Sequence, residues 1–302
     1  MDAIALGATL YIPASRTDLA AILGGRHPNL RSAVLCLEDS THHSDVPRAL
    51  INLARLLRDA ARKEEASPGP ALFVRPRDAA MLAHILGFEG VETLAGFVIP
   101  KASPDNFPAY LDCLADDRHL LMPTLEAPEL LDGAEMRRLR DQLLAVRARI
   151  LAIRIGGNDL LKAIGARRSA VRTAYDGPLG TMIAGFVAAF APFGFALSAP
   201  VFEHFANADL LREEVERDLE HGLFTKTAIH PAQIEIIQAA YAVDADTLAE
   251  AEALVMDEPR GVFASRGAMC EPETHGNWAH SIIRRAEAFG VTGAARVSGL
   301  RS

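Results

Sequence analysis

The sequence predicts an α/β fold, a TIM (β/α)₈ barrel with a C-terminal helical extension. Short apolar runs rich in β-forming residues alternate with segments of helical spacing, and this alternation is typical of a parallel sheet. Eight such runs favour a closed barrel over an open doubly wound sheet. Several runs end in charged residues, and a barrel gathers the carboxyl ends of its strands around one pocket. The pattern therefore predicts both the fold and the location of an active site.

The eight expected strands are short and apolar throughout, as in a sheet that is buried on both faces. They cover residues 5–13, 33–38, 71–75, 95–100, 119–125, 150–156, 195–199 and 225–230. The expected helices carry apolar residues at three- and four-residue spacing. They cover residues 17–24, 46–65, 78–87, 105–116, 134–149, 178–190, 207–221 and 231–241. Together these elements place the barrel in residues 1–241.

After residue 241 the alternation of strands and helices stops. Helices are expected at 246–256 and 277–289 with no strand among them, so residues 242–302 are expected to form a helical extension. Its apolar side chains must pack on the barrel or on a neighbouring subunit, because a large exposed apolar patch usually marks an interface. The side chains concerned are Met269, Trp278, Ile282 and Ile283. The tail at 291–302 is small and polar and is expected to fray.

Composition and charge argue against several classes of protein. Half of the 302 residues are hydrophobic, and the net charge of −8 disfavours nucleic acid as a partner, because phosphate binding needs a basic face. The three cysteines lie far apart without zinc spacing and fit a reducing cytosol. The N-terminus lacks a signal-peptide pattern. The apolar stretch 180–198 is broken by Pro192 and Gly194, which favours a buried helix and strand over a membrane span. We therefore expect a cytoplasmic protein without membrane contact.

Two carboxylates at neighbouring strand ends are the candidates for holding a metal. Glu126 follows the strand at 119–125, and Asp159 follows the strand at 150–156. Adjacent strand ends of a barrel lie side by side, and Mg²⁺ is commonly held by one or two carboxylates, with water and substrate oxygens completing an octahedron. The other interpretation is that both residues are helix N-caps, since each precedes a helical run. The spacing alone leaves both interpretations open.

Three more charged residues end the second and fourth strands, and all three are candidate catalytic residues. Glu38 and Asp39 form an acidic pair that could position a metal-bound water or a lysine, or could serve as a cap with a salt bridge. Lys101 follows the fourth strand, where a lysine could form a Schiff base as in some aldolases. Because several carboxylates are expected nearby, an ion-pair role for Lys101 is favoured.

Four arginines are candidates for binding an anionic substrate. Arg75 ends the third strand and is also a candidate catalytic residue, and Arg77 follows two residues later. A planar guanidinium binds a carboxylate with two parallel hydrogen bonds. Arg16 follows the first strand, and Arg154 adds a positive charge near the expected metal. His230 ends the last strand, where a single histidine is more often a structural residue than a base.

Taken in order, these strand ends resemble the citrate lyase beta-subunit family of the HpcH/HpaI aldolase superfamily. The similarity covers roughly residues 8–290, and its most specific segment is Ala228-Ile-His-Pro-Ala-Gln-Ile234. The other matching segments are Leu10-Tyr-Ile-Pro-Ala-Ser-Arg16, Leu37-Glu-Asp-Ser40, Val74-Arg75, Val98-Ile-Pro-Lys101, Pro123-Thr-Leu-Glu126 and Gly156-Gly-Asn-Asp159. Each segment alone is weak, and their combination is specific.

The resemblance implies a Mg²⁺-dependent carbon–carbon bond lyase on a TIM barrel, assembled as a homo-oligomer, commonly a trimer or hexamer. It implies that Glu126 and Asp159 bind the metal and that Arg75 contacts the oxo-acid part of the substrate. Arg16 matches a position near the acyl-carrier end. The residues that match a supporting polar ring are Glu38, Asp39 and Lys101.

The resemblance also implies a proton-transfer residue in the C-terminal segment. Family members often supply an Asp from a neighbouring subunit in a Gly-x-Met-x-Asp context. Here the run is Gly267-Ala-Met-Cys-Glu271, so we expect Glu271 in that role.

The sequence thus predicts a Mg²⁺-dependent lyase that cleaves or forms a 3-hydroxyacyl thioester or a related 2-oxo or 2-hydroxy acid. A coenzyme A thioester is a candidate substrate. Two alternatives stay open. One is an aldolase that acts on a free oxo acid without coenzyme A. The sequence departs from the family pattern near Arg77 and at Arg154, and these departures favour this alternative. The other is a catalytically silent subunit that binds a metabolite or serves assembly.

Overall fold

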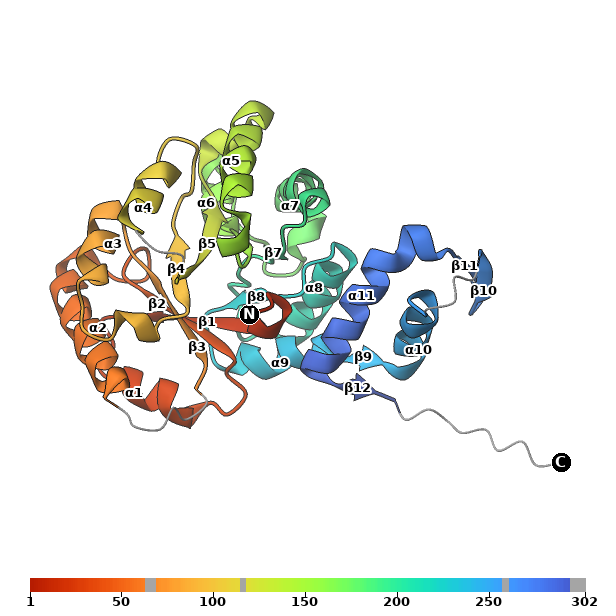
Figure 1. Cartoon of the computed structure of the whole chain (residues 1–302), viewed down its shortest axis with the longest axis horizontal. Helices are drawn as coiled ribbons and strands as arrows, with labels where there is room; N and C mark the ends of the chain where they lie inside the picture. The colour runs from red at the N-terminus through yellow and green to blue at the C-terminus, as the bar shows by residue number, and fades with distance from the viewer. Residues whose placement is uncertain (63–68, 115–117, 257–260, 294–302) are drawn as a thin grey trace. The chain divides into compact units, whose positions relative to one another are not determined.

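Eight parallel strands form a closed barrel in the first of two units, Met1–Ile237 (Figure 1). The protein is seen here as a computed structural model that describes residues 1–62, 69–114, 118–256 and 261–293. The strands are β1 (Ala8–Pro13), β2 (Ser32–Cys36), β3 (Ala71–Arg75), β4 (Gly96–Ile99), β5 (Leu120–Leu125), β6 (Ile153–Ile155), β7 (Leu197–Ser198) and β8 (Lys226–Ala228). They follow the order β7-β6-β5-β4-β3-β2-β1-β8.

A parallel bridge between Ala199 and Lys226 joins the two ends of this sheet. Its hydrogen bonds run from Ala199 N to Thr225 O, at 2.8 Å, and from Thr227 N to Ala199 O, at 3.2 Å. Because the first and last strands in the order are joined, the sheet is a barrel. The predicted TIM barrel is confirmed.

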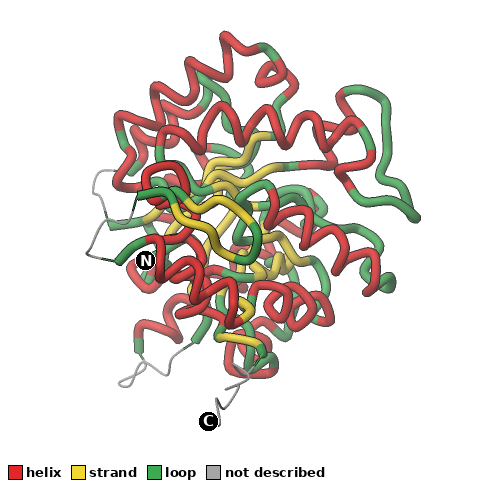
Figure 2. The backbone as a smooth tube through the Cα atoms, turned by 90° about the vertical axis from the view of Figure 1, so that its right-hand side faces the viewer, coloured by secondary structure: helices red, strands yellow, loops and turns green. Residues whose placement is uncertain are grey.

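Helices cover the outside of the barrel, as Figure 2 shows for the red segments around the yellow strands. They are α1 (Leu19–Ala21), α2 (Val46–Ala61), α3 (Ala79–Leu86), α4 (Phe107–Cys113), α5 (Gly133–Ala145), α6 (Gly157–Ala163), α7 (Pro178–Phe190) and α8 (Ala208–Glu220). α9 (Ala232–Tyr241) follows β8 and crosses into the second unit. In α2, Ala49, Leu53 and Leu57 recur every four residues and are fully buried, which is the spacing of an amphipathic helix.

The barrel interior changes from apolar to charged along the strands. One fully buried cluster takes a residue from each of four successive strands, namely Val34, Phe73, Val98 and Met122. Side chains along a strand alternate between its two faces, so every second residue returns to the interior. Arg75 follows Phe73 at this spacing, and Glu126 lies four residues after Met122. The strands therefore deliver both charged side chains to the carboxyl end of the interior.

The second unit, Gln238–Ser302, combines helices with two small sheets. Its elements are α10 (Ala245–Leu254), α11 (Pro272–Phe289), the parallel pair β9 (Val243–Asp244) and β12 (Val291–Thr292), and the antiparallel pair β10 (Phe263–Ser265) and β11 (Ala268–Cys270). The expectation of a segment without strands is therefore wrong. Arg266 and Gly267 join β10 to β11 with φ values of 50° and 82°, a left-handed hairpin turn. An Asn-Gly pair predicts such a turn from sequence, whereas an Arg-Gly pair does not.

Other elements differ from the expected ones at their ends. Ile4–Leu6 form a 3₁₀ turn ahead of β1, and the helix expected at 17–24 is reduced to α1 and a turn that breaks at Gly25, where φ is 104°. The short helix α6 is not among the expected helices. Residues 294–302 of the expected frayed tail lie outside the described residues. None of the described helices has the length and apolar character that a membrane span requires.

A buried ion cluster ties β8 to α8 and to the loop before α7. Lys226 is fully buried, and its ammonium lies 3.0 Å from Glu214 Oε1 and 2.8 Å from Asp218 Oδ2. Glu214 also accepts hydrogen bonds from the Arg168 guanidinium and, at 2.8 Å, from the backbone N–H of Ala174. Although burial opposes its charge, Lys226 and Arg168 lower the pKa of Glu214 to about 2. The charges in this part of the wall are therefore paired, as buried charges must be.

We predict that Glu214→Ala lowers the free energy of unfolding by about 3–5 kcal/mol, because it leaves Lys226 and Arg168 poorly compensated in the interior. Urea denaturation measures the change. Asp209→Ala on the same helix is the matched control and should have little effect, since Asp209 pairs with Arg212 where its side chain is 96% exposed. Equal losses in the two variants would contradict the importance of the buried cluster.

Candidate active site

Arg75 lies at the centre of a charged cluster at the carboxyl end of the barrel. It ends β3 and is 7% exposed. Its Nη2 atom lies 2.6 Å from Glu126 Oε1, 2.9 Å from Glu38 Oε2 and 3.2 Å from Asp39 Oδ2. Glu126 directly follows β5, and the other two acids follow β2. One guanidinium therefore binds three carboxylates that two other strands supply.

Lys101 adds a second cation to the cluster and a second hydrogen bond to Glu126. Its ammonium bonds to Glu38 and lies 3.4 Å from Asp39 Oδ1, and its backbone N–H donates to Glu126 Oε1 at 2.8 Å. Lys101 has a φ of 45°, a left-handed conformation that is strained for a lysine. Asn106 supports it by donating from Nδ2 to Lys101 O at 2.8 Å. The strained turn aims a backbone donor at the acid that is the most deeply buried in the cluster.

Three carboxylates lie close enough to share one divalent ion. One oxygen from each of Asp39, Glu126 and Asp159 lies within 4.8 Å of the other two. Gly156 makes room for this group, because a Cβ atom added there would lie 2.2 Å from Glu126 Oε2. Carboxylate oxygens are the ligands that Mg²⁺ prefers, with water or substrate completing its octahedron. The donor set and the space around it fit a divalent metal.

Neither candidate metal ligand is a helix N-cap. Ala127 caps the 3₁₀ turn that follows Glu126, and Gly156 caps α6. Asp159 lies within the first turn of α6, where a negative charge is favoured by the helix dipole. The N-cap interpretation is therefore wrong, and metal binding by these two residues stays a prediction.

Burial controls the charge of Glu126. It raises the pKa of this carboxyl to about 7, although the charge of Arg75 and the N–H of Lys101 act in the opposite direction. The charge of Asp159 raises the pKa further. Arg75 remains charged, because Glu126 and the other groups around the guanidinium together outweigh the effect of burial and raise its pKa. In the absence of metal, Glu126 titrates near neutral pH, whereas a bound cation favours its carboxylate form.

The cluster has a buried side and an open side. Glu126 and Arg75 are nearly inaccessible, whereas the side chains of Asp39 and Lys101 are 51% and 44% exposed. Asp159 is also partly exposed. A ligand that enters the mouth of the barrel therefore meets Asp39, Lys101 and Asp159 first. Arg75 lies deeper in the barrel and influences a ligand through the carboxylates that it binds.

Two of the arginines predicted to bind substrate are engaged in other contacts. Arg77 donates to the backbone carbonyls of Glu38, at 3.2 Å, and of Thr41. It thereby holds the turn that carries the acidic pair. Arg16 pairs with Asp18 on the surface, with 2.8 Å between Nε and Oδ1. Substrate binding by Arg77 and Arg16 stays a prediction.

The other two candidate residues lie in different units, with Arg154 inside the barrel and Glu271 in the second unit. Arg154 is 1% exposed inside the barrel, where it donates to Thr227 Oγ1 at 2.7 Å. Its guanidinium carbon lies 5.2 Å from the centroid of the Tyr11 ring. Glu271 directly precedes α11 in the second unit and accepts a hydrogen bond from Thr274 Oγ1 at 3.0 Å. The acid/base role of Glu271 stays a prediction from the resemblance.

Sequence reasoning did not single out Tyr11, which packs against Arg154, or Asn106, which binds the carbonyl of Lys101. Asn106 is an ordinary polar residue in a loop, and nothing in its sequence context indicates the carbonyl it binds. Tyr11 lies in an apolar strand that is buried on both faces, so the alternation of side chains does not tell which face is inside.

His230 makes contacts that suit a structural residue. Its ring stacks on Phe205 with ring centroids 4.8 Å apart, and it accepts a hydrogen bond from the backbone N–H of Ala232.

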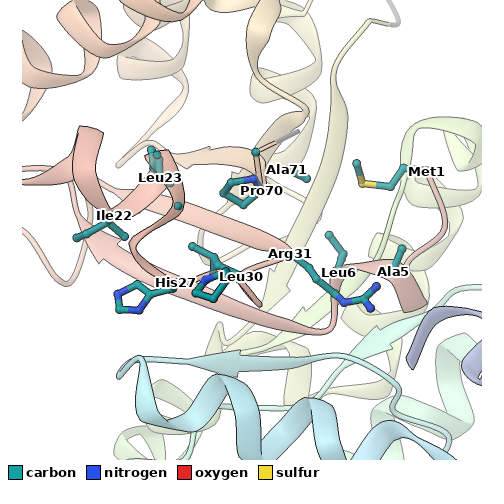
Figure 3. Close-up of a pocket in the computed structure, with 14 residues that line it drawn as sticks. Met1, Ala5, Leu6, Ile22, Leu23, His27, Leu30, Arg31, Pro70 and Ala71 are labelled. Carbon is teal, nitrogen blue, oxygen red and sulfur yellow. The ribbon is translucent and has the colours of Figure 1, made fainter. Parts of the chain in front are cut away.

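A cavity of about 820 Å³ lies at the opposite, amino-terminal end of the barrel (Figure 3). Leu6, Leu30 and Pro70, which line it, come just before β1, β2 and β3. Its other lining residues are mostly apolar, with His27 and Arg31 among them. TIM-barrel enzymes carry their chemistry at the carboxyl ends of the strands. The charged cluster, and not this cavity, is therefore the candidate active site.

The chain matches a known family over almost its whole length. Residues 1–291 match the family described as C–C bond lyases of the TIM-barrel fold. The chain belongs to this family. The predicted resemblance to citrate lyase beta subunits is confirmed. The family assignment agrees with the barrel and with the acidic cluster at its carboxyl end.

Solved structures support the fold of this C–C bond lyase family member. Protein CitE from Mycobacterium tuberculosis, in complex with magnesium, acetoacetate and coenzyme A, is 22% identical with a TM-score of 0.68, and the match covers 93% of this chain and 98% of CitE. RipC from Yersinia pestis is 21% identical with a TM-score of 0.60, over 81% of this chain and 98% of RipC. At such identities the similarity shows the fold.

A curated relative is similar over a shorter stretch. The (3S)-malyl-CoA thioesterase of Cereibacter sphaeroides is 31% identical over 144 residues, which are 48% of this chain and 46% of the relative. The match thus spans about half the length of that protein. The family is enzymatic, and the relative shows that thioester hydrolysis occurs among similar proteins.

We predict that Gly156→Ala weakens Mg²⁺ binding roughly 10- to 100-fold, as is typical when a support of a metal ligand is lost. The added methyl group would lie 2.2 Å from Glu126 Oε2, so this carboxylate must move. Calorimetric titration of Mg²⁺ measures the affinity. Gly185→Ala in α7 is the matched control, because a Cβ atom there meets nothing within 4 Å. Equal affinities in the two variants would show that the space beside Glu126 does not matter.

We also predict that Mg²⁺ affinity rises with pH up to about 7 and then levels off. The raised pKa means that Glu126 of the metal-free protein holds a proton below about 7, and the metal must displace it. Each pH unit below the pKa should therefore weaken binding by up to about tenfold. Titrations below and above this pKa test the slope, with Glu126→Gln as a control that cannot release the proton. An affinity that is constant through this range would contradict the assignment of Glu126.

Proposed function

We propose that this protein is a divalent-metal-dependent lyase that cleaves or forms a carbon–carbon bond in a 3-hydroxyacyl thioester or a related 2-oxo or 2-hydroxy acid. The observation that carries the proposal is the approach of carboxylate oxygens from Asp39, Glu126 and Asp159 within 4.8 Å of one another at the mouth of the barrel. Magnesium, acetoacetate and coenzyme A in the similar CitE structure support this class of metal and ligand.

In this proposal the buried and the exposed residues of the cluster have different tasks. Glu126 and Asp159 hold Mg²⁺, which when bound supplies positive charge for the oxygen that becomes negative as the carbon–carbon bond breaks. Lys101 binds the carboxylate of the substrate from the open side, where its ammonium is accessible. Arg75 orients the carboxylates and contributes a fixed positive charge that needs no rearrangement during the reaction.

Cleavage needs one proton acceptor and one proton donor. The substrate hydroxyl loses its proton and becomes the carbonyl of the oxo acid, while the electron pair of the broken bond passes to the acyl fragment as an enolate. We assign the acceptor to Asp39. Burial opposes its charge, but contact with Glu38 and the charges of Arg75 and Lys101 lower the pKa of Asp39, so it is ionised at neutral pH. The enolate carbon then takes a proton, for which the resemblance indicates Glu271.

Hydrolysis of a thioester is the second candidate function, because the similar relative is a (3S)-malyl-CoA thioesterase. Here a water molecule adds to the thioester carbonyl, the carbon–sulfur bond breaks and coenzyme A leaves as the thiol. Asp39 would take the proton of the attacking water. The two candidate functions use the same charged cluster and differ in the bond that breaks.

(3S)-Malyl-CoA distinguishes these functions, because its products differ. Breaking the carbon–carbon bond gives glyoxylate and acetyl-CoA, whereas hydrolysis gives malate and free coenzyme A. A 4-hydroxy-2-oxo acid without coenzyme A tests the aldolase alternative, because its hydroxyl carbon can become the carbonyl of one product. We expect Mg²⁺-dependent carbon–carbon cleavage. Binding of an oxo acid with no turnover of any of these compounds would instead support the catalytically silent subunit.

We predict that Glu126→Gln folds normally and loses more activity than the roughly 10- to 100-fold typical of changes outside the ligand set of a metal. The amide keeps the shape of the side chain and removes the charge that holds the cation. Glu129→Gln is the matched control, since Glu129 is exposed in the turn just after the site. Steady-state rates at saturating Mg²⁺ make the comparison. Activity of Glu126→Gln equal to that of Glu129→Gln would overturn the metal-dependent mechanism.

A further inference from the structure

We propose that the Tyr11 hydroxyl binds the substrate by donating a hydrogen bond to a negatively charged oxygen of the oxo or hydroxy acid. This inference rests on the proposed function and assigns one more substrate-binding group to the same site.

The first argument is that the charged groups of the site are already bound to one another. Arg75 Nη2 contacts three carboxylates, and the Lys101 ammonium contacts Glu38 and Asp39. An incoming carboxylate must compete for these cations, so it also needs donors that have no protein partner. The Tyr11 hydroxyl has no hydrogen-bond partner among the residues that the structure describes. Arg75 Nε is a second such donor within the described part of the site, and it is buried.

The second argument is the position of Tyr11 within the barrel. Leu10 and Ile12, on either side of it in β1, are each 3% exposed. Tyr11 itself packs on the interior cluster that contains Val34 and Phe73, yet it remains partly exposed. Tyr11 is therefore an interior residue whose side chain is not completely enclosed.

The charges that act on Tyr11 point to the same place. They belong to Arg154, Arg75, Cys36 and Glu126, which come from β6, β3, β2 and the end of β5. A side chain of β1 can face groups from four other strands only if it points into the barrel. Two of these groups, Arg75 and Glu126, belong to the charged cluster, so the phenol lies within the electrostatic reach of that cluster.

The third argument concerns the state and orientation of the phenol. Burial raises the pKa of Tyr11 and outweighs the opposite effects of Arg154 and Arg75, so the hydroxyl keeps its proton and is a donor. The Arg154 guanidinium carbon lies 5.2 Å from the ring centroid, a cation–π distance, and Thr227 Oγ1 holds this guanidinium at 2.7 Å. The ring is therefore fixed before the ligand arrives, and Arg154 acts on the substrate through the position of Tyr11.

A neutral donor on which the positive charges of Arg154 and Arg75 act suits an oxygen that carries negative charge. The carboxylate of an oxo acid has such oxygens, and so does the enolate that forms during cleavage. Phenylalanine at position 11 would preserve the packing of the ring and the cation–π contact but would lack the donor. The hydroxyl thus contributes to ligand binding rather than to the core, and this contribution can be measured separately.

The test is the affinity of Tyr11→Phe for pyruvate and oxaloacetate in the presence of saturating Mg²⁺, measured by calorimetry alongside the affinity for Mg²⁺ alone. We expect oxo-acid binding to weaken by about 3- to 10-fold, the effect of one lost hydrogen bond, and Mg²⁺ binding to stay unchanged. Tyr175→Phe is the matched control, because the Tyr175 hydroxyl donates to Asp218 at 2.5 Å in the wall of the barrel. It should bind both ligands as the wild type does.

Three results would overturn the inference, and they differ in what else they overturn. If the wild type binds oxo acids and Tyr11→Phe binds them equally well, the hydroxyl has no role and the proposed function stands. If the wild type binds no oxo acid even with Mg²⁺, the proposed function and the role of Tyr11 are both wrong. A parallel loss of Mg²⁺ affinity in Tyr11→Phe would show a structural effect and would also refute the assignment.

Discussion

The contact of Arg75 with three carboxylates is the interaction on which the rest of the site depends. Like charges repel strongly in surroundings of low dielectric constant, and Glu126 is among the most deeply buried acids of the chain. Even beside Arg75, burial brings its pKa to about 7. A lysine at this position could lose its proton on burial, whereas a guanidinium stays charged and offers several donors in one plane. The choice of arginine at the end of β3 therefore allows carboxylates from β2 and β5 to meet.

The positions of these acids are fixed by backbone groups and by side chains that do not pair with the carboxylates. Gly156 leaves the volume that Glu126 occupies. The left-handed backbone of Lys101 aims its N–H at the same carboxylate, at 2.8 Å, and Asn106 supports that conformation. Arg77 binds the backbone of the turn that carries Glu38. The site is thus a property of backbone geometry as much as of the ionisable side chains.

The parts of this arrangement that follow from strand order were predictable from the sequence. Parallel strands bring successive carboxyl ends to one rim, and the pairing of Leu125 with Ile155 places Glu126 and Asp159 side by side. The contacts of Arg77 and Arg16 were not predictable, because a long flexible side chain can reach several partners and only the local backbone decides among them. Tyr11 was missed for a different reason: a strand buried on both faces gives no signal of which face is inside.

The charges of the cluster also couple the metal to the acid that it would bind. Four carboxylates, those of Glu38, Asp39, Glu126 and Asp159, face the two cations Arg75 and Lys101. An anionic acid therefore meets an unfavourable potential in the metal-free site, and protonation of Glu126 relieves it only in part. A divalent cation bound there would cancel the excess of negative charge, and an anionic acid would then meet a more favourable potential. We therefore expect metal and acid to favour each other's binding through the electrostatic potential alone, even where they share no ligand atom.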